Sequence, residues 1–414
     1  MEAADARGSE SRTSLSVITT RPENELLVCA ARRSLDDDLA ARMTALVDGE
    51  LDWNYLRDKA TQQGMMPLLY RHLNSVCPQS VPTPILDSMK EESIANSQTC
   101  LYLFSELRKL LRLLDQNGIT AVAFKGPVLS VAVYRDIALR QAGDLDILIE
   151  PGAFRPARDL LSSAGYRLHP PLTESQQASH LRSHCEIQFL SNGLSVVDLH
   201  WGLSPKSFHF ALDPNHVIDR SKNISIQGTS LLTFSNEDTI LYLCYHGSKH
   251  YWSRLEWISS LAEFIRSNED IDWPIVIARA NAARGRHMLT LGLMLGRELG
   301  DVDIPDSVLS CGEDFDSLRE YAAEIQRGLL AREPGSMGAV EMFRCNLRIM
   351  DRNRDAITSL LRSIFVPTIS DWQTLTLPDA LYPLYYLFRP LRLLKKYGAS
   401  SMGRAGSPEV DISS

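Results

Sequence analysis

Short runs of apolar residues, separated by turns, predict the organisation of the centre of this chain. An apolar run from Ile119 to Phe124 predicts a buried strand, which Lys125-Gly126-Pro127 interrupts. The apolar residues from Val128 to Tyr134 indicate one or two helical turns. From Asp144 to Ile149 polar and apolar residues alternate, and this pattern predicts a strand with both aspartates of Asp144-Leu145-Asp146 on one face.

A second pair of alternating runs follows about forty residues later in the chain. Residues 184–190 and 194–201 flank Ser191-Asn192-Gly193, and Asn-Gly between two such runs is a strong signal for a β-hairpin. The alternation in the second strand places Val196, Asp198 and His200 on the same face.

Helical periodicity dominates on both sides of this centre, with apolar residues three and four positions apart. A long helix is expected from about Ile85 to Asn117, because Gly118 is a favourable residue directly after a helix end. The predicted organisation is a disordered N-terminus, a helical region, a core that mixes strands and helices, a second helical region and a flexible tail, at residues 1–23, 24–117, 118–235, 236–398 and 399–414.

Composition narrows the class of protein. Hydrophobic residues make up 44% and charged residues 23%, as in ordinary soluble proteins. A net charge of −8 argues against general nucleic-acid binding, which requires clustered lysine and arginine. The seven cysteines are scattered without a Cys-x-x-Cys pair, and we find neither a signal-peptide pattern nor an apolar run long enough for a transmembrane segment. We therefore expect a cytoplasmic protein.

The aspartates are the strongest candidates for chemistry. Asp144 and Asp146 lie about 7 Å apart along one strand face, and Mg²⁺ prefers hard oxygen ligands and retains waters that a phosphate can replace. Gly126 precedes a helix, where free backbone N–H groups can meet that phosphate. Asp198 is the candidate third carboxylate, and Glu186 on the partner strand is its rival.

The segment from Val122 to Glu150 resembles the polymerase-β-like nucleotidyltransferase superfamily. More narrowly, it is similar to a bacterial family of largely uncharacterised nucleotidyltransferases, in the ordered positions Lys125-Gly126, Tyr134, Arg140 and Asp144-x-Asp146. The Asp198-Leu-His-Trp string and the segment from His246 to Trp252 match that family too, and the resemblance extends over roughly residues 24–398. One departure is Gly126-Pro127, where the superfamily usually has Gly-Ser or Gly-Gly.

Each basic residue near these motifs has more than one interpretation. Lys125 either approaches a phosphate of the nucleotide or points into solvent. Arg140 either contacts Asp144 or the triphosphate, or forms a structural ion pair. His200 shares the face of Asp198 and is either a group that supports the site, a base, or a structural histidine.

Helical spacing brings together a further group of candidates. His246 and His250 are four residues apart with Lys249 between them, so both imidazoles lie on one helix face. No His-Glu-x-x-His pattern accompanies them, which argues against zinc. We interpret the three residues as nucleotide or acceptor contacts, with core packing as the alternative.

The resemblance implies an α+β fold, in which a mixed nucleotidyltransferase sheet lies between N- and C-terminal helical regions. It also implies an enzyme that moves an NMP from an NTP such as ATP to a hydroxyl acceptor, with Mg²⁺ (or Mn²⁺) held by Asp144, Asp146 and Asp198. We expect the acceptor to be a small molecule, a sugar or a protein. Two alternatives are a toxin-like transferase acting on tRNA or protein, and a non-catalytic nucleotide-binding scaffold or accessory protein.

Overall fold

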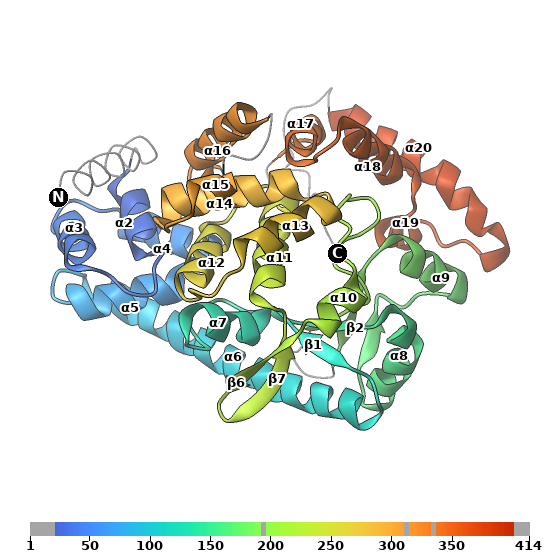
Figure 1. The fold of residues 1–414 in the computed structure, drawn as a ribbon, viewed down its shortest axis with the longest axis horizontal. Coiled ribbons are helices and arrows are strands. Elements are labelled where there is room, and N and C mark those ends of the chain that lie inside the picture. Colours follow the sequence, from blue (N-terminus) through green and yellow to red (C-terminus); the bar gives the residue numbers. More distant parts are fainter. Residues whose placement is uncertain (1–20, 192–195, 310–313, 333–336, 401–414) are drawn as a thin grey trace.

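A five-stranded mixed sheet lies at the centre of a largely helical chain (Figure 1). The computed structural model describes residues 21–191, 196–309, 314–332 and 337–400. The strands are β1 Ala121–Ala123, β2 Asp144–Ile149, β3 Arg167–His169, β4 Glu186–Leu190 and β5 Val196–His200, with a separate hairpin of β6 Lys222–Ile226 and β7 Thr229–Thr233. The predicted mixture of helices with a mixed sheet is therefore confirmed.

The order of strands in the sheet is β1-β2-β5-β4-β3. Strands β2 and β5 are parallel, and every other neighbouring pair is antiparallel. Strand β2 spans the predicted residues, and β4 pairs with β5 as the hairpin signal predicts. The Asn192-Gly193 turn itself lies outside the described residues.

One face of the sheet is apolar and covered by helices. Leu145, Ile147 and Ile149 of β2 are almost completely buried in a cluster with leucines of α6 (Thr83–Gln116) and with Phe154 and Leu161 of α8 (Phe154–Ser163). Because side chains alternate along a strand, this packing directs Asp144 and Asp146 to the opposite face.

Among the described N-terminal helices, one packs against the sheet and the other four pack against the rest of the molecule. Only α6, which runs along the lower edge of Figure 1, belongs to the apolar cluster beneath the sheet. It ends where the sequence predicts, because Gly118 adopts a φ of +71° and Ile119 N–H closes the helix by donating to Leu114 C=O. The four preceding helices are α2 Pro22–Ala30, α3 Asp37–Val47, α4 Trp53–Gln62 and α5 Met66–Val76.

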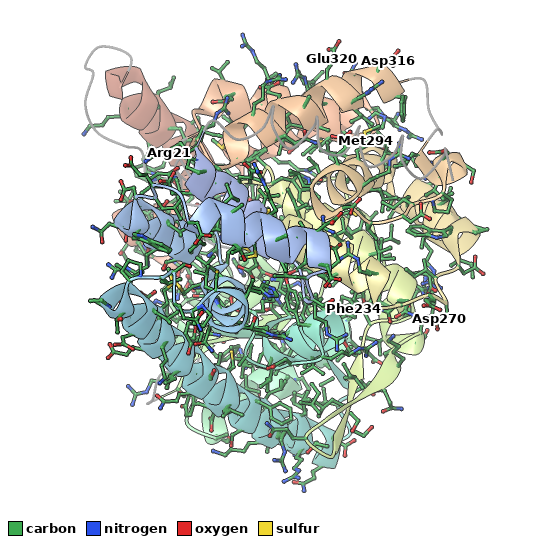
Figure 2. The ribbon with its side chains drawn as sticks, turned by 90° about the vertical axis from the view of Figure 1, so that its left-hand side faces the viewer. Arg21, Phe234, Asp270, Met294, Asp316 and Glu320 are labelled. Carbon is green, nitrogen blue, oxygen red and sulfur yellow. The ribbon has the colours of Figure 1, made fainter. Side chains whose placement is uncertain are left out.

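These four helices share one apolar core with helices from the second half of the chain. Ser259 joins the two halves, since its hydroxyl donates to Ala31 C=O at 2.8 Å and contacts the Tyr134 hydroxyl at 2.8 Å. In Figure 2 Met294 lies inside this helical part, whereas Asp316 and Glu320 lie at its periphery. The second-half helices are α11 Asn236–Lys249, α12 Leu255–Arg266, α13 Trp273–Ala283, α14 Arg286–Gly300, α15 Asp306–Leu309, α16 Phe315–Leu329, α17 Ala339–Ile349, α18 Asn353–Phe365, α19 Ile369–Thr374 and α20 Tyr385–Ser400.

Helices α18 to α20 lie beside α9 (Glu174–Ser183), at one edge of the sheet (Figure 1). The short helix α10 spans Pro214–Asp219. Helix α20 is attached by Tyr385, which is fully buried, and by Arg389, which bonds to Asp371 at 2.6 Å. Its outward leucines, Leu387 and Leu391, are 68% and 65% exposed. Within the described residues, the helices are all too short or too polar to cross a membrane.

Candidate active site

Two neighbouring parallel strands bring the predicted carboxylates together. Asp146 of β2 is the direct partner of Asp198 of β5, so their Cα atoms lie about 4.8 Å apart across the ladder. Asp144 lies two residues earlier on the same face of β2. Asp146 and Asp198 are only 2% and 9% exposed. The sheet thus gathers three carboxylates on a face that is largely shielded from water.

One oxygen of Asp146 is fully used by basic side chains. Lys125 Nζ donates to Oδ1 at 2.7 Å, and His200 Nε2 lies 3.0 Å from the same atom. The second oxygen, Oδ2, is buried and has no hydrogen-bond partner among the described residues, and the same holds for Asp198 Oδ1. Buried carboxylate oxygens without partners are unfavourable unless a cation or donor satisfies them.

The carboxylates also repel one another. Burial, followed by the charges of Asp146 and Asp144, raises the pKa of Asp198 to about 7. The charge of Asp146, followed by burial, raises the pKa of Asp144. Burial opposes the ionisation of Asp146, but Lys125 and His200 outweigh it and lower its pKa. Lys125 and His200 therefore compensate the negative charge of Asp146. The raised pKa values of Asp144 and Asp198 show that the negative charge of the face is not fully compensated.

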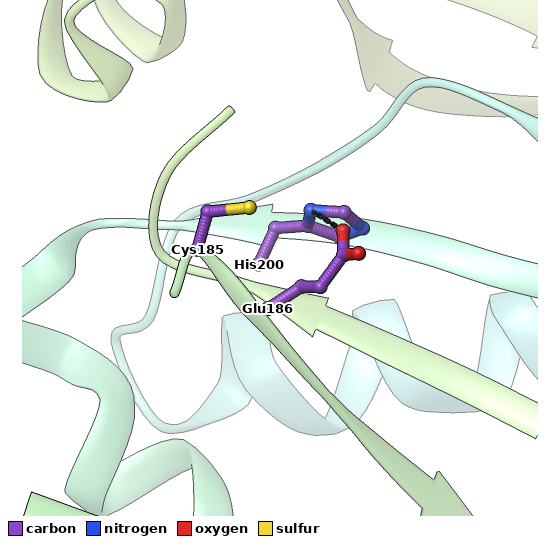
Figure 3. Close-up of side chains that lie close together, drawn as sticks. All are labelled: Cys185, Glu186 and His200. Carbon is purple, nitrogen blue, oxygen red and sulfur yellow. Dashed lines mark ion pairs between the residues drawn. The ribbon is translucent and has the colours of Figure 1, made fainter. Parts of the chain in front are cut away.

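His200 connects Asp146 to Glu186. Its Nδ1 lies 2.9 Å from Glu186 Oε2 in an ion pair, and Cys185 lies beside them (Figure 3). Burial opposes a charge on His200, but Glu186 and the contact with Asp146 keep its pKa well above the usual value. Cys185, Glu186 and His200 are close enough to share a metal ion. However, both ring nitrogens of His200 already face carboxylates, and burial raises the pKa of the Cys185 thiol.

The turn after β1 is held against the start of β2. Gly126 has a φ of +54°, and a Cβ atom added there would lie 2.9 Å from the carbonyl oxygen of Asp144. Glycine is required for both reasons. Gly126 begins helix α7 (Gly126–Tyr134), and Pro127 occupies the first turn, where a missing N–H breaks no helical hydrogen bond. Pro127 does, however, remove one donor from the helix start.

Arg140 forms an ion pair with Glu256, a residue that no sequence pattern singles out. Its guanidinium lies 2.7 Å from Glu256 of α12, and the Glu256 side chain is 3% exposed. Gly64 packs against this carboxylate so closely that a Cβ atom there would lie 2.0 Å from Glu256 Oε2. The pair therefore ties the segment before Asp144 to α12 and to the N-terminal helices.

Helix α11 brings Lys249 toward the acidic face. Lys249 Nζ lies 4.0 Å from Glu186 Oε1. The rings of His246 and His250 contact each other, with centroids 4.7 Å apart, and both contact Trp257. Burial, followed by the neighbouring charge of Lys249, lowers the pKa of His250 to about 3. Burial likewise holds the pKa of His246 well below its usual value, so both histidines are neutral members of an aromatic group with Trp257.

Tyr242, on the same helix, is a further neighbour of the site that sequence reasoning did not single out. Its ring lies 5.7 Å from Lys125 Nζ and packs edge-on against Phe124. An aromatic position in an apolar helix carries no signal of its own for such a role, because a core tyrosine gives the same pattern.

A comparison with protein-family models identifies the chain. The model of the family described as uncharacterised nucleotidyltransferases matches residues 49–301, more than half of the sequence. The chain belongs to this family. A search of the curated proteins gives no match.

The match of the nucleotidyltransferase family covers the whole acidic face. It includes the three aspartates, Lys125, Gly126 and the α11 residues. Residues 24–48 and 302–398, to which we also expected the resemblance to extend, lie outside it. Helices α15 to α20 therefore lie outside the matched part of the chain.

Proposed function

We propose that this protein is a metal-dependent nucleotidyltransferase that moves an NMP from an NTP to a hydroxyl group of an acceptor. The pairing of Asp146 with Asp198, each with a buried oxygen that has no hydrogen-bond partner among the described residues, carries the proposal. The family, together with a mixed sheet that carries an Asp-x-Asp strand after a glycine turn, supports a sheet of the polymerase-β-like type.

Asp144, Asp146 and Asp198 are the residues that would hold Mg²⁺ or Mn²⁺. The fit rests on donor chemistry, since carboxylate oxygens are the ligands these ions prefer, and on the unsatisfied oxygens of this face. When bound, the ion neutralises charge on the triphosphate and on the reacting oxygens. Asp198 is preferred over Glu186 because it is the direct neighbour of Asp146, whereas Glu186 is engaged by His200.

The other groups of the face have supporting roles in this proposal. Lys125 and Gly126 lie beside the start of β2 and would receive the triphosphate, Lys125 through its charge and Gly126 through the close approach of its backbone. His200 and Glu186 orient Asp146, because the imidazole is held from both sides. Arg140 supports the segment before Asp144 through Glu256.

The proposed reaction is an in-line displacement at the α-phosphorus. The acceptor oxygen forms a new bond to this phosphorus, and the bond between the phosphorus and the bridging oxygen breaks. Pyrophosphate leaves with the electron pair of that bond, and the hydroxyl proton passes to a carboxylate, a role that we assign to Asp198.

Nucleotide binding provides the first test. Each NTP is titrated with and without Mg²⁺ against the wild type, Asp144→Asn/Asp146→Asn and a control variant, Asp87→Asn/Asp115→Asn, which removes two exposed carboxylates of α6. We expect Mg²⁺-dependent binding of at least one NTP, retained in the control and lost in the site variant. Binding that is equal in all three proteins, or absent at millimolar NTP, would overturn the proposal and favour a scaffold role.

A further inference from the structure

A cavity of about 510 Å³ lies next to the candidate active site, between α9 and the C-terminal helices α17 to α20. Its wall is rich in cationic side chains. They come from α9, the segment after β5, the end of α11, α18 and α20, and are Arg182, Lys206, Lys249, Arg362, Arg389 and Arg392. No aspartate or glutamate is among the described residues that line it. Such a wall is unexpected in a chain with a net charge of −8, and it favours an anionic ligand.

Some of this positive charge is compensated within the protein. Arg389 and Arg392 share the single carboxylate of Asp371, at 2.6 Å each, and so retain one net positive charge between them. Lys249 lies 4.0 Å from Glu186. Arg182 and Lys206 are exposed at the cavity wall. The wall therefore retains an excess of positive charge beside these ion pairs, and this charge is available to a ligand.

The strand order separates this cavity from the turn at Gly126. Strand β1 and the turn that follows it lie on one side of β2, whereas β5 and then β4 lie on the other. Residues directly before β4, Ser183 and His184, and residues after β5, 205–208, line the cavity together with α9 and Lys249, so it lies at the ends of β4 and β5. A chain of contacts leads from it to the carboxylates, from Lys249 to Glu186 at 4.0 Å, from Glu186 to His200 at 2.9 Å and from His200 to Asp146 at 3.0 Å.

We propose that the cavity binds the phosphate group of a small phosphorylated acceptor, whose hydroxyl group is thereby presented to the carboxylates. This inference rests on the proposed nucleotidyl transfer. The triphosphate of the donor and the anionic group of the acceptor then bind on opposite sides of Asp146 and Asp198. The C-terminal helices, outside the matched family region, supply Arg362, Arg389 and Arg392 and so contribute to the choice of acceptor.

The size and lining of the cavity favour a small molecule over a nucleic acid. Its volume falls within the range of about 300–1,000 Å³ that is typical of small-molecule sites. Phe208, Tyr251 and Tyr386 add aromatic surface that suits a ring or apolar part of the ligand. A duplex or a long single strand would instead require a continuous basic surface.

Inorganic phosphate is the probe for this site, and its binding is followed by ³¹P NMR titration. The variant Arg182→Gln/Lys206→Gln removes two exposed cations of the wall, and Lys90→Gln/Arg112→Gln removes two exposed cations of α6 as a matched control. We expect the affinity for phosphate to fall about tenfold or more in the first variant and to be unchanged in the second. Asp144→Asn/Asp146→Asn should bind phosphate like the wild type.

Competition with the nucleotide separates this inference from the proposed function. Saturating Mg²⁺ and NTP should leave phosphate bound, and Arg182→Gln/Lys206→Gln should bind NTP like the wild type. Displacement of phosphate by NTP, with loss of both in the cavity variant, would assign the cavity to the donor triphosphate instead. Equal phosphate affinity in all variants, or salt-sensitive binding of a short RNA that depends on Arg182 and Lys206, would also overturn the inference. Phosphate binding without any NTP binding would refute the acceptor role and the transferase together.

Discussion

Replacing Gly126 by alanine tests how closely the turn and the acidic face depend on each other. The left-handed backbone at φ +54° costs a non-glycine residue about 1–2 kcal/mol. The new Cβ atom would also meet Asp144 C=O at 2.9 Å, and a backbone oxygen cannot move aside alone. Relief requires a shift of a few tenths of an ångström between α7 and β2, which displaces Asp144 relative to Asp198. We expect Mg²⁺-dependent NTP binding to weaken about tenfold.

Gly118→Ala is the matched control for this variant. Gly118 has a φ of +71°, and an added Cβ atom there would meet nothing within 4 Å. Gly118→Ala should lose about 1–2 kcal/mol of unfolding free energy in chemical denaturation through backbone strain alone, and Gly126→Ala should lose more, because it adds the contact with Asp144 C=O. Only Gly126→Ala should lose nucleotide affinity, as measured by calorimetric titration. Equal nucleotide affinity in the two variants would refute the proposed coupling between the turn and Asp144.

Two further predictions concern stability. Arg140→Met leaves the buried Glu256 carboxylate without its closest partner, so chemical denaturation should show a loss of about 3 kcal/mol of unfolding free energy. The double variant Arg140→Met/Glu256→Gln should recover part of this loss, and no recovery would show that the ion pair is not its cause. His250 stays neutral in the folded protein because its pKa is lowered to about 3, whereas the unfolded chain takes up the proton below about pH 6.5, so stability falls as the pH falls from there. Between pH 7 and pH 5, His250→Gln should therefore lose about 2 kcal/mol less unfolding free energy than the wild type, and an equal loss in both proteins would contradict this account.

Local pattern was sufficient for the elements that carry the carboxylates. Alternation predicted β2 and the shared face of Asp144 and Asp146, and the end of α6 at Gly118 followed from its glycine. The pairing of β4 with β5 followed from the two alternating runs. The adjacency of Asp146 and Asp198 depends on a parallel pairing between strands that are distant in the sequence, and only the family resemblance indicated it.

Contacts between distant segments could not be predicted in this way. Arg140 meets Glu256 of α12, and the cations of the cavity wall come from five separate segments of the chain. The residues next to each of these lysines and arginines in the sequence do not distinguish a cavity wall from an ordinary surface. His200 is similar, since its role between Asp146 and Glu186 depends on the position of its own strand, β5, between β2 and β4.

Binding of Mn²⁺ in the absence of nucleotide, followed by electron paramagnetic resonance, tests the central claim most directly. The comparison is between the wild type, Asp198→Asn and Glu186→Gln. If Asp144, Asp146 and Asp198 hold the ion, Asp198→Asn should lose Mn²⁺ binding while Glu186→Gln retains it. Loss of binding in Glu186→Gln with retention in Asp198→Asn would contradict the account and place the ion at the group of Cys185, Glu186 and His200 instead.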